Sequence, residues 1–112
     1  MFEATPSVCP IRLVLTTVAN PEEAARLGRT LVEERLAACA NIVPQIESIY
    51  RWQGKIESGT EVFMIFKTTH GRYQQLEQRL KELHPYEVPE IVVLQVRDGL
   101  PAYLNWIVES CN

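Results

Sequence analysis

The stretch His84-Pro85-Tyr86-Glu87-Val88-Pro89-Glu90-Ile91 lies where a predicted helix passes into a predicted strand. Each proline fixes its own φ and biases the residue before it toward extended backbone, so the segment between the two rings is stiff. A histidine, a tyrosine and two glutamates are therefore held at defined positions. Stiff polar junctions on small α/β domains serve as binding sites and as simple connectors about equally often. The junction indicates the order of the elements but not their chemistry.

The residues on both sides of this junction predict a helix followed by a strand. Upstream, four side chains recur at steps of three and four, the spacing of one helix face: Tyr73, Leu76, Leu80 and Leu83. Pro85 stops this helix. Downstream, the apolar run at residues 91–96 predicts a buried strand. The turn residues 98–101 then lead into a short final helix that carries Tyr103, Leu104, Trp106 and Ile107.

The first half of the chain also begins with a strand and a helix. Residues 11–18 are rich in β-branched and apolar side chains, and the unbroken Leu13-Val14-Leu15 favours a central strand. The start of the next helix is unusually complete. Asn20 can cap it, Pro21 suits its first position, and Glu23 stands where a capping box places its acid.

A helical projection from Ala24 separates an apolar side from a charged side. Only Arg35 falls inside the apolar stripe, where its stem can pack while its charge reaches water. The apolar side comprises Leu27, Ala38, Leu31, Ala24, Gly28, Cys39, Val32 and Leu36. This pattern predicts a helix that lies on a sheet and continues through residue 39.

Residues 41–66 change to a strand pattern and predict a long hairpin. Gln53-Gly54 is the best turn candidate, because glycine adopts positive φ without steric cost, and Ser58-Gly59 is its competitor. The returning strand is residues 62–68. Either turn makes the arms longer than the usual ~5–6 residues. Pro44 implies a bulge or an edge position in the first arm.

The predicted order is β-α-β-β-α-β-α, which is an α+β arrangement. Two βαβ halves that share one antiparallel sheet make a ferredoxin-like domain with helices on one face, here extended by a C-terminal helix. Residues 10–112 are expected to form this single domain. Residues 1–9 carry no periodicity and are expected to be a flexible tail.

Composition narrows the class of protein. The chain has 112 residues, is 46% hydrophobic and carries a net charge of −3, so it suits one compact domain and argues against nucleic-acid binding. It contains no apolar run of the ~20 residues that a membrane span needs. Its first residues lack the basic start and apolar core of a signal peptide. We therefore expect a cytoplasmic protein without a membrane or nucleic-acid partner.

The three cysteines cannot all pair within one chain, and none forms a C-x-x-C motif. Cys9 and Cys111 lie near the termini and are expected to be exposed thiols. Cys39 lies among small residues, which favours a buried, inert thiol over a reactive nucleophile, since the latter needs a nearby base. Three free thiols are expected in a cytoplasmic protein.

Four motifs, in order along the chain, resemble the CutA family of divalent-cation tolerance proteins. The resemblance runs from about residue 11 to residue 107 and rests on Glu34-Arg35-Leu36-Ala37-Ala38-Cys39-Ala40-Asn41-Ile42, Tyr50-Arg51-Trp52-Gln53-Gly54-Lys55-Ile56, Lys67-Thr68-Thr69 and the stretch at 84–91. It implies a ferredoxin-like subunit that assembles into a tight homotrimer akin to the PII signalling proteins. It also implies a link to tolerance of copper and other divalent cations, and binding of metal ions.

The resemblance points to a metal site that is altered in this chain. The ligands proposed for bacterial relatives are a cysteine at the end of the first strand and two histidines before the Pro-Tyr pair. The matching residues here are Thr16, Leu83 and His84, so only His84 remains a good transition-metal ligand. Tight Cu²⁺ or Zn²⁺ sites need three or four donors, so further ligands would have to come from Glu87, Glu90, Cys39 or a neighbouring subunit. An equally favoured role for His84 is charge complementation at the helix end.

The long hairpin carries the residues of a second candidate site. Tyr50 and Trp52 near its tip would be costly to expose on a monomer, which favours packing at an interface over stacking on nucleic acid. A ligand cleft between subunits would be lined by Cys39, Trp52, Lys55, Glu61, Lys67, Tyr86 and Glu90. The alternative for its charged members is a set of solvated or cross-strand pairs. His70 is expected to be a surface residue.

The function favoured by these observations is a trimeric, non-enzymatic protein that binds copper, another divalent cation or a small ligand. An enzyme using Cys39 or His84 is the competing class, but the chain has no G-x-S-x-G, no phosphate-binding glycine loop and no H-E-x-x-H. A third class stays open. It is an assembly scaffold or small-molecule signalling protein with no physiological metal.

Overall fold

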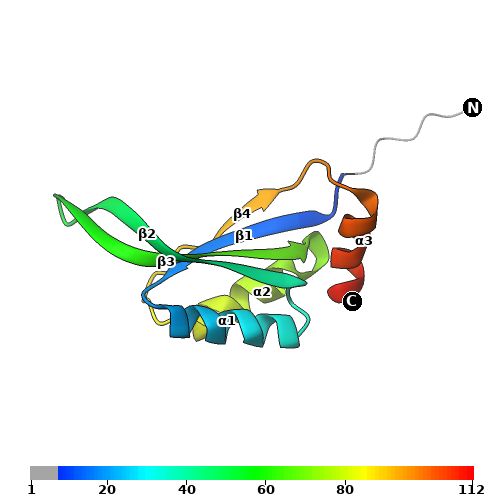
Figure 1. The fold of residues 1–112 in the computed structure, drawn as a ribbon, viewed down its shortest axis with the longest axis horizontal. Helices are drawn as coiled ribbons and strands as arrows, with labels where there is room; N and C mark the ends of the chain where they lie inside the picture. Colours follow the sequence, from blue (N-terminus) through cyan, green and yellow to red (C-terminus); the bar gives the residue numbers. More distant parts are fainter. Residues whose placement is uncertain (1–7) are drawn as a thin grey trace, which may run out of the picture.

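The computed structural model describes residues 8–112, and the first seven residues of the predicted tail lie outside this part. The predicted order of elements is confirmed (Figure 1). The strands and helices are β1 (Ile11–Val18), α1 (Pro21–Glu33), β2 (Cys39–Trp52), β3 (Lys55–Thr69), α2 (His70–Leu83), β4 (Val92–Gln95) and α3 (Pro101–Ser110).

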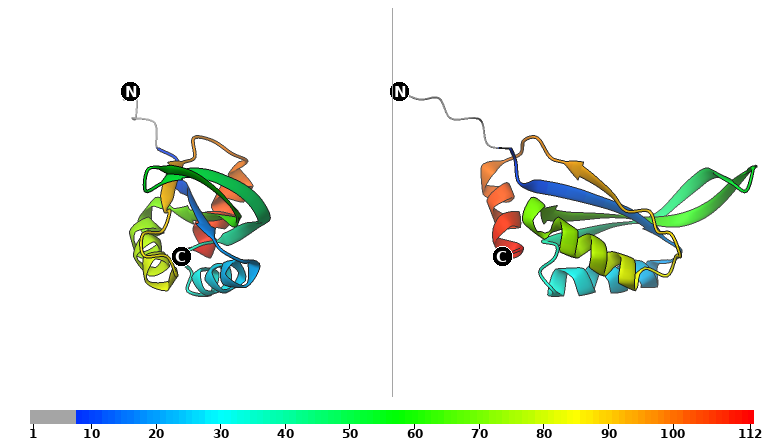
Figure 2. Two further views of the ribbon diagram at one scale, coloured as in Figure 1. Left: turned by 90° about the vertical axis from the view of Figure 1, so that its left-hand side faces the viewer. Right: turned by 180° about the vertical axis from the view of Figure 1, so that it is seen from behind.

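The four strands form one antiparallel sheet in the order β2-β3-β1-β4, which is the ferredoxin-like topology. β1 lies inside the sheet, as its apolar run predicted. The two views of Figure 2 show α1 and α2 side by side on one face of the sheet, and α3 at the end farthest from the β2–β3 hairpin. The opposite face of the sheet carries no helix along most of its length.

Alternation along the strands places the core between the sheet and the two long helices. Alternate side chains of β1 and β3 are buried on this face, among them Val14, Val18, Met64 and Phe66. They meet a stripe from the helices that comprises Leu27, Leu31, Leu76 and Leu80. A second, smaller cluster joins Ile11 and Ala38 to α3 through Ile107 and Cys111. These two clusters hold α3 and the helix pair on the same sheet.

The start of α1 is as predicted, but its end is not. The side-chain Oδ1 of Asn20 accepts a hydrogen bond of 2.8 Å from the backbone N–H of Glu23, and Pro21 occupies the first turn. The helix ends at Glu33, and Arg35 has the positive φ of 60° that terminates it. Residues 36–38 are buried because they cross to the sheet, where the Ala38 N–H donates to the Lys67 carbonyl oxygen at 2.8 Å. The apolar spacing of residues 36–38 therefore does not extend α1. It arises because this segment is buried where the chain passes from the helix to the sheet.

The β2–β3 hairpin turns where Gln53-Gly54 predicted. Both residues are left-handed, with φ of 49° and 80°, which matches the twist of a two-residue hairpin turn. The register shifts between Val43 and Ile46, so Pro44 lies in a bulge of an edge strand, as expected. The radius of gyration is 16.0 Å, whereas a compact domain of this length has about 13 Å. The hairpin therefore extends beyond the body of the domain as an arm (Figure 1).

The prediction that residues 91–96 form a buried strand is wrong for the single chain. β4 has four residues, and Val92 and Leu94 are each 46% exposed. β4 is an edge strand, and these two side chains pair with Leu15 and Leu13 on the face opposite α1 and α2. The apolar side chains of β4 are of the kind that strands bury, but no other part of the described chain covers them.

In the part of the chain that the structure describes, none of the helices is both long enough and apolar enough to cross a membrane.

Candidate functional site

The connection from α2 to β4 folds against the hairpin arm, and an open cleft of about 810 Å³ runs between them from the base of the arm toward its turn. β1 contributes its end to the cleft, the arm contributes both of its strands, and the connection contributes the far wall. The lining residues are Thr17, Ser48, Ile49, Tyr50, Trp52, Glu61, Tyr86, Glu87, Val88 and Glu90. The stiff junction that the two prolines predicted is therefore one wall of the largest hollow described in the chain.

His84 anchors this wall to the sheet. Its ring is buried, with 6% of the residue exposed, and its Nε2 lies 2.9 Å from the carbonyl oxygen of Thr17. Its Nδ1 accepts a hydrogen bond of 3.1 Å from the backbone N–H of Tyr86. Because Nδ1 accepts, Nε2 carries the proton and donates to Thr17. Burial lowers the pKa of His84, with the Thr17 carbonyl opposing the shift, so the ring is neutral and does not complement the helix end as a cation.

Tyr86 continues this chain of hydrogen bonds into the cleft. Its ring centroid lies 4.7 Å from that of His84, and its hydroxyl donates to Oε2 of Glu61 at 3.1 Å. Burial, reinforced by the bond to Glu61, raises the pKa of Tyr86 to about 12, so the phenol keeps its proton at neutral pH. Thr17, His84, Tyr86 and Glu61 thus form one connected network that fixes the position of the tyrosine and of the carboxylate.

The structure brings together four of the residues predicted for the cleft: Trp52, Glu61, Tyr86 and Glu90. Lys55 lies at the hairpin turn, paired with Trp52 across the strands, and does not line the cleft. Cys39 and Lys67 face each other across β2 and β3 at the other end of the sheet. There the Lys67 ammonium donates to the Tyr103 hydroxyl at 3.1 Å, which raises the pKa of the lysine.

Sequence reasoning missed several lining residues. Thr17, Ser48, Ile49 and Val88 gave no signal, because their part in the cleft depends on how the arm and the connection meet. Tyr50 and Glu87 were noted for an interface and a metal site rather than for this cleft. The shared parity of Tyr50 and Trp52 on one strand was the available signal, since alternate residues of a strand lie on one side.

The three residues that the family resemblance pointed to as a metal site do not form a metal cage within one chain. Thr16 is fully buried in the core, and its hydroxyl has no hydrogen-bond partner in the described part of the chain. Leu83 is apolar and packs against the main core cluster. Both ring nitrogens of His84 are already hydrogen-bonded. No group of three His, Cys, Asp or Glu side chains among residues 8–112 could hold a metal ion.

Three predictions about the cysteines are wrong. Cys9 is half-buried rather than exposed. Cys111 is buried rather than exposed, because α3 folds back onto the strand end at Ile11 and carries the thiol inward. Its Sγ lies 3.9 Å from Oγ1 of Thr68, and burial raises its pKa. Cys39 is half-buried rather than buried, since it begins β2 instead of ending α1; its Sγ lies 3.8 Å from Oδ1 of Asn41.

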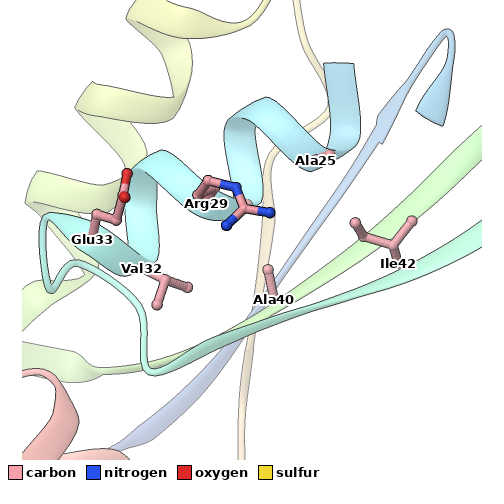
Figure 3. A pocket seen from close by; sticks show the side chains of 7 residues that line it. Ala25, Arg29, Val32, Glu33, Ala40 and Ile42 are labelled. Carbon is pink, nitrogen blue, oxygen red and sulfur yellow. The ribbon is translucent and has the colours of Figure 1, made fainter. Parts of the chain in front are cut away.

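A second hollow of about 370 Å³ lies between α1 and β2 (Figure 3). Figure 3 shows the side chains of Val32, Ala40 and Ile42 along it, with the Arg29 guanidinium reaching across the opening. Small residues let the helix approach the strand here: a Cβ added at Gly28 would lie 3.1 Å from the Cβ of Ala40. We interpret this hollow as a packing groove, because none of the predicted site residues lines it.

Comparison with known proteins agrees with this fold. A family model described as CutA1 divalent ion tolerance protein matches residues 12–110. The divalent-cation tolerance protein CutA of Thermus thermophilus is 49% identical over 98 residues, which are 88% of this chain and 95% of that protein. Protein CutA of Mus musculus is 43% identical over 97 residues, which are 87% of this chain but 55% of the longer mouse protein.

A solved structure shows the same fold. The crystal structure of CutA from Xylella fastidiosa matches with a TM-score of 0.89 and 41% sequence identity, covering 92% of this chain and 99% of that one. The family model spans both long helices, all four strands and the hairpin arm. The motifs, the ferredoxin-like topology and these matches together show that the chain belongs to the CutA1 divalent ion tolerance protein family.

Proposed function

We propose that the protein is a homotrimer that binds a divalent cation, copper or another, or a small ligand in the cleft at the base of its arm, without catalysis. The cation is exchangeable cargo in this proposal rather than a resident cofactor. The proposed compartment is the cytoplasm, where free thiols persist.

The exposed arm is the observation that supports assembly. Four large apolar side chains of the arm are each more than 45% exposed in the single chain: Ile49, Tyr50, Trp52 and Ile56. On the face of the sheet opposite α1 and α2, Val92 and Leu94 are also exposed. Apolar patches of this extent are rare on monomers, and strand edges left open invite pairing with another chain. Neighbouring copies of the subunit would cover both the arm and the open face.

The geometry of the cleft supports binding rather than catalysis. His84 is the histidine nearest the cleft, and both of its ring nitrogens are engaged in hydrogen bonds, so it cannot act as a base without breaking one. Tyr86 keeps its proton at neutral pH. The three glutamates at the cleft, Glu61, Glu87 and Glu90, give it a negative charge that attracts cations.

Light scattering on the full chain at micromolar concentration tests assembly, with the mass of three chains expected and a folded monomer as the contrary result. Calorimetric titration with Cu²⁺ tests cation binding. We expect Glu90→Gln, in the connection, to weaken it, while Glu57→Gln, the same charge change on the arm and outside the lining of the cleft, should leave it intact.

Including His84→Ala in the copper titration tests whether binding depends on the histidine, as the family resemblance implies. Equal binding by His84→Ala and the unchanged protein would remove His84 from the site. Absence of copper binding by all variants would leave a small-ligand protein or an assembly scaffold as the function.

A further inference from the structure

The helix α3 differs from the other two helices in having almost no charged side. It includes a single charged residue, Glu109, whereas α1 and α2 carry five charged residues each. The rings of Tyr103 and Trp106 stack with their centroids 5.5 Å apart, and these residues are 41% and 44% exposed. A helix that is apolar on nearly every side is normally buried. The described part of the chain leaves this side of α3 uncovered.

An apolar groove lies beside this helix, where α3 meets the face of the sheet opposite α1 and α2. Its volume is about 510 Å³, and most of its lining is apolar, including Leu13, Leu100, Tyr103 and Leu104. Leu13 pairs with Leu94 of β4, which is 46% exposed on the same face. An apolar surface therefore extends from α3 onto the uncovered face of the sheet.

The tip of the arm carries apolar side chains that also lack cover. Tyr50 and Trp52 lie on one side of β2, and their partners across the hairpin are Glu57 and Lys55. This tip and α3 lie at opposite ends of the molecule, whose longest dimension is 60 Å (Figure 1). The arm of one chain therefore does not reach its own groove, and an arm in the groove has to come from another copy.

We propose that the tip of the arm docks in the groove beside α3 of a neighbouring copy, with Trp52 and Tyr50 packed against Leu100 and Tyr103. This inference rests on the homotrimer of the proposed function, and it names the two surfaces that join the subunits. Because the two surfaces differ, the contact is heterologous, and such contacts close into a ring when each copy docks its arm on the next. Each contact covers one exposed arm and one exposed side of α3.

The charges of the two surfaces are complementary. The arm carries one acid and one base beside its rings, Glu57 and Lys55, and the groove carries one of each, Asp98 and Lys67. Opposite charges can therefore face each other in one orientation of the arm, which favours that orientation over others. The side chain of Asp98 is 90% exposed, with Arg97 at 3.8 Å. The ammonium group of Lys67 has further donors besides the one that it gives to Tyr103.

The exposed apolar area suits the centre of a subunit contact. Buried aromatic side chains cover about 150–250 Å² each. Tyr50, Trp52, Tyr103 and Trp106 are between 41% and 59% exposed, so each of them leaves on the order of 100 Å² to be covered. Interfaces have an apolar, aromatic-rich centre and a polar rim, and the charged residues beside these rings would form the rim.

Cross-linking between introduced cysteines locates the contact in the assembled protein. The full chain, with its three native cysteines replaced by alanine, receives Lys55→Cys and Asp98→Cys and is treated with a short bismaleimide, each of whose C=C bonds takes up one thiol. Denaturing electrophoresis should show most of the protein as a covalent trimer, because each arm is joined to the next copy. Lys55→Cys with Lys81→Cys, at an exposed site on α2, is the matched control and should stay monomeric. Lys55→Cys alone should stay monomeric as well.

A substitution in the groove measures the contact without altering the cysteines. Leu100→Asn removes an apolar side chain at the residue that caps α3, where asparagine is favoured, so it should not weaken the subunit itself. The urea concentration at which light scattering no longer gives the mass of three chains should fall by roughly 0.5–1 M, the shift that corresponds to a tenfold loss of affinity. Val108→Asn, at an exposed side chain of α3 outside the groove, is the control and should shift it by less than half as much.

Three outcomes would overturn the docking proposal. The first is a trimer in which Lys55→Cys with Asp98→Cys gives no more cross-linked product than the control pair. The second is cross-linking of Lys55→Cys alone, which would mean that the arms meet tip to tip. The third is an equal shift in urea for Leu100→Asn and Val108→Asn, and this comparison decides alone if the cysteine-free chain does not assemble.

These outcomes are distinct from a failure of the proposed function. If the native protein has the mass of three chains and any of the three outcomes occurs, the homotrimer stands and is joined through other surfaces. If the native protein has the mass of one chain by light scattering, the homotrimer and the docking proposal both fail.

Discussion

The Nε2 atom of His84 lies 2.9 Å from the carbonyl oxygen of Thr17, and this hydrogen bond ties the end of α2 to the end of β1. The other ring nitrogen accepts from the N–H of Tyr86, so one imidazole connects the sheet to the stiff junction that walls the cleft. The same histidine is the residue that the family resemblance pointed to as a metal ligand. Its position in this structure makes it a positioning residue for Tyr86.

Stability should fall with acid because of His84. Its pKa is lowered in the folded state, mainly by burial, so the unfolded chain takes up a proton more readily. The stability that the neutral ring contributes is therefore fully present above about pH 6.5, the pKa of histidine in the unfolded chain. It is lost as the pH falls from there toward the lower pKa of His84 in the folded protein. Urea unfolding between pH 5 and 8, at fixed protein concentration, measures this. His84→Gln should flatten the acid loss, and His70→Gln, at an exposed histidine, should retain it.

His84→Gln should also destabilise the protein at pH 8. It breaks one buried and one partly buried hydrogen bond, and we expect a loss of about 1–3 kcal/mol in the free energy of unfolding. An unchanged midpoint at pH 8 would show that the glutamine or water replaces both bonds.

Alkaline titration should show that Tyr86 ionises well above the ordinary range of a tyrosine. Its pKa is about 12 against an ordinary value of 10.0, because it is buried and donates to Glu61. The folded state therefore holds this proton more tightly, and the resulting stability is present below about pH 10 and is lost as the pH rises through about 12. Absorbance of tyrosinate should lose its highest-pH component in Tyr86→Phe. Retention of that component in the variant would assign it to another tyrosine.

Trp52→Ala should weaken assembly. The side chain is exposed in the single chain, and truncation of a large aromatic at an interface typically costs a few kcal/mol, about 2–4. Sedimentation across a concentration series would show dissociation at higher concentration than for the unchanged protein. Val32→Ala, at an exposed side chain of the groove between α1 and β2 and away from the arm, is the control and should assemble normally. Equal assembly of both variants would place Trp52 outside the interface.

Two glycines of the hairpin should respond differently to alanine. Gly54 has φ of 80°, a conformation that costs an L-residue about 1–2 kcal/mol, so Gly54→Ala should lower stability by about that amount. Gly59 lies within β3 with open space around it and no positive φ, so Gly59→Ala should be close to neutral. Denaturant unfolding of the two variants side by side checks this. A larger loss for Gly59→Ala would contradict the turn at Gln53-Gly54.

Thiol reactivity should separate Cys111 from Cys39. Cys111 is buried, and burial raises its pKa, so both access and thiolate fraction are low. Cys39 is half-buried and should react with a disulfide reagent faster in the native protein. Under denaturing, non-reducing conditions three thiols per chain should react. A native Cys111 that reacts as fast as Cys39 would show that α3 opens readily from the sheet.

Several features of the fold followed from short-range chemistry and could be predicted. Asn20 and Pro21 define a helix start, because the cap and the fixed φ act within one turn. Gln53-Gly54 defines the hairpin turn, because few residues adopt two successive left-handed conformations. Pro44 indicates a bulge in an edge strand, because it has no N–H to donate.

The features that could not be predicted depend on segments distant in sequence. Burial of residues 36–38 looked helical in spacing, yet it comes from a crossing that pairs Ala38 with Lys67. Cys111 seemed exposed because it is near a terminus, but α3 packs it against Thr68. Lys67 seemed suited to the cleft, but the register of β2 and β3 places it beside Tyr103.

The sequence by itself determined the order of the strands and helices, the start of α1, the turn of the arm, and the stiff junction that carries His84, Tyr86 and Glu90. These properties arise from backbone preferences and periodic burial, which act over a few residues. Only the tertiary structure decided that Tyr86 meets Glu61 and that Trp52 shares a cleft with both. It also decided that both ring nitrogens of His84 are engaged. Such relationships are distances between residues far apart along the chain, and packing of the whole sheet sets them.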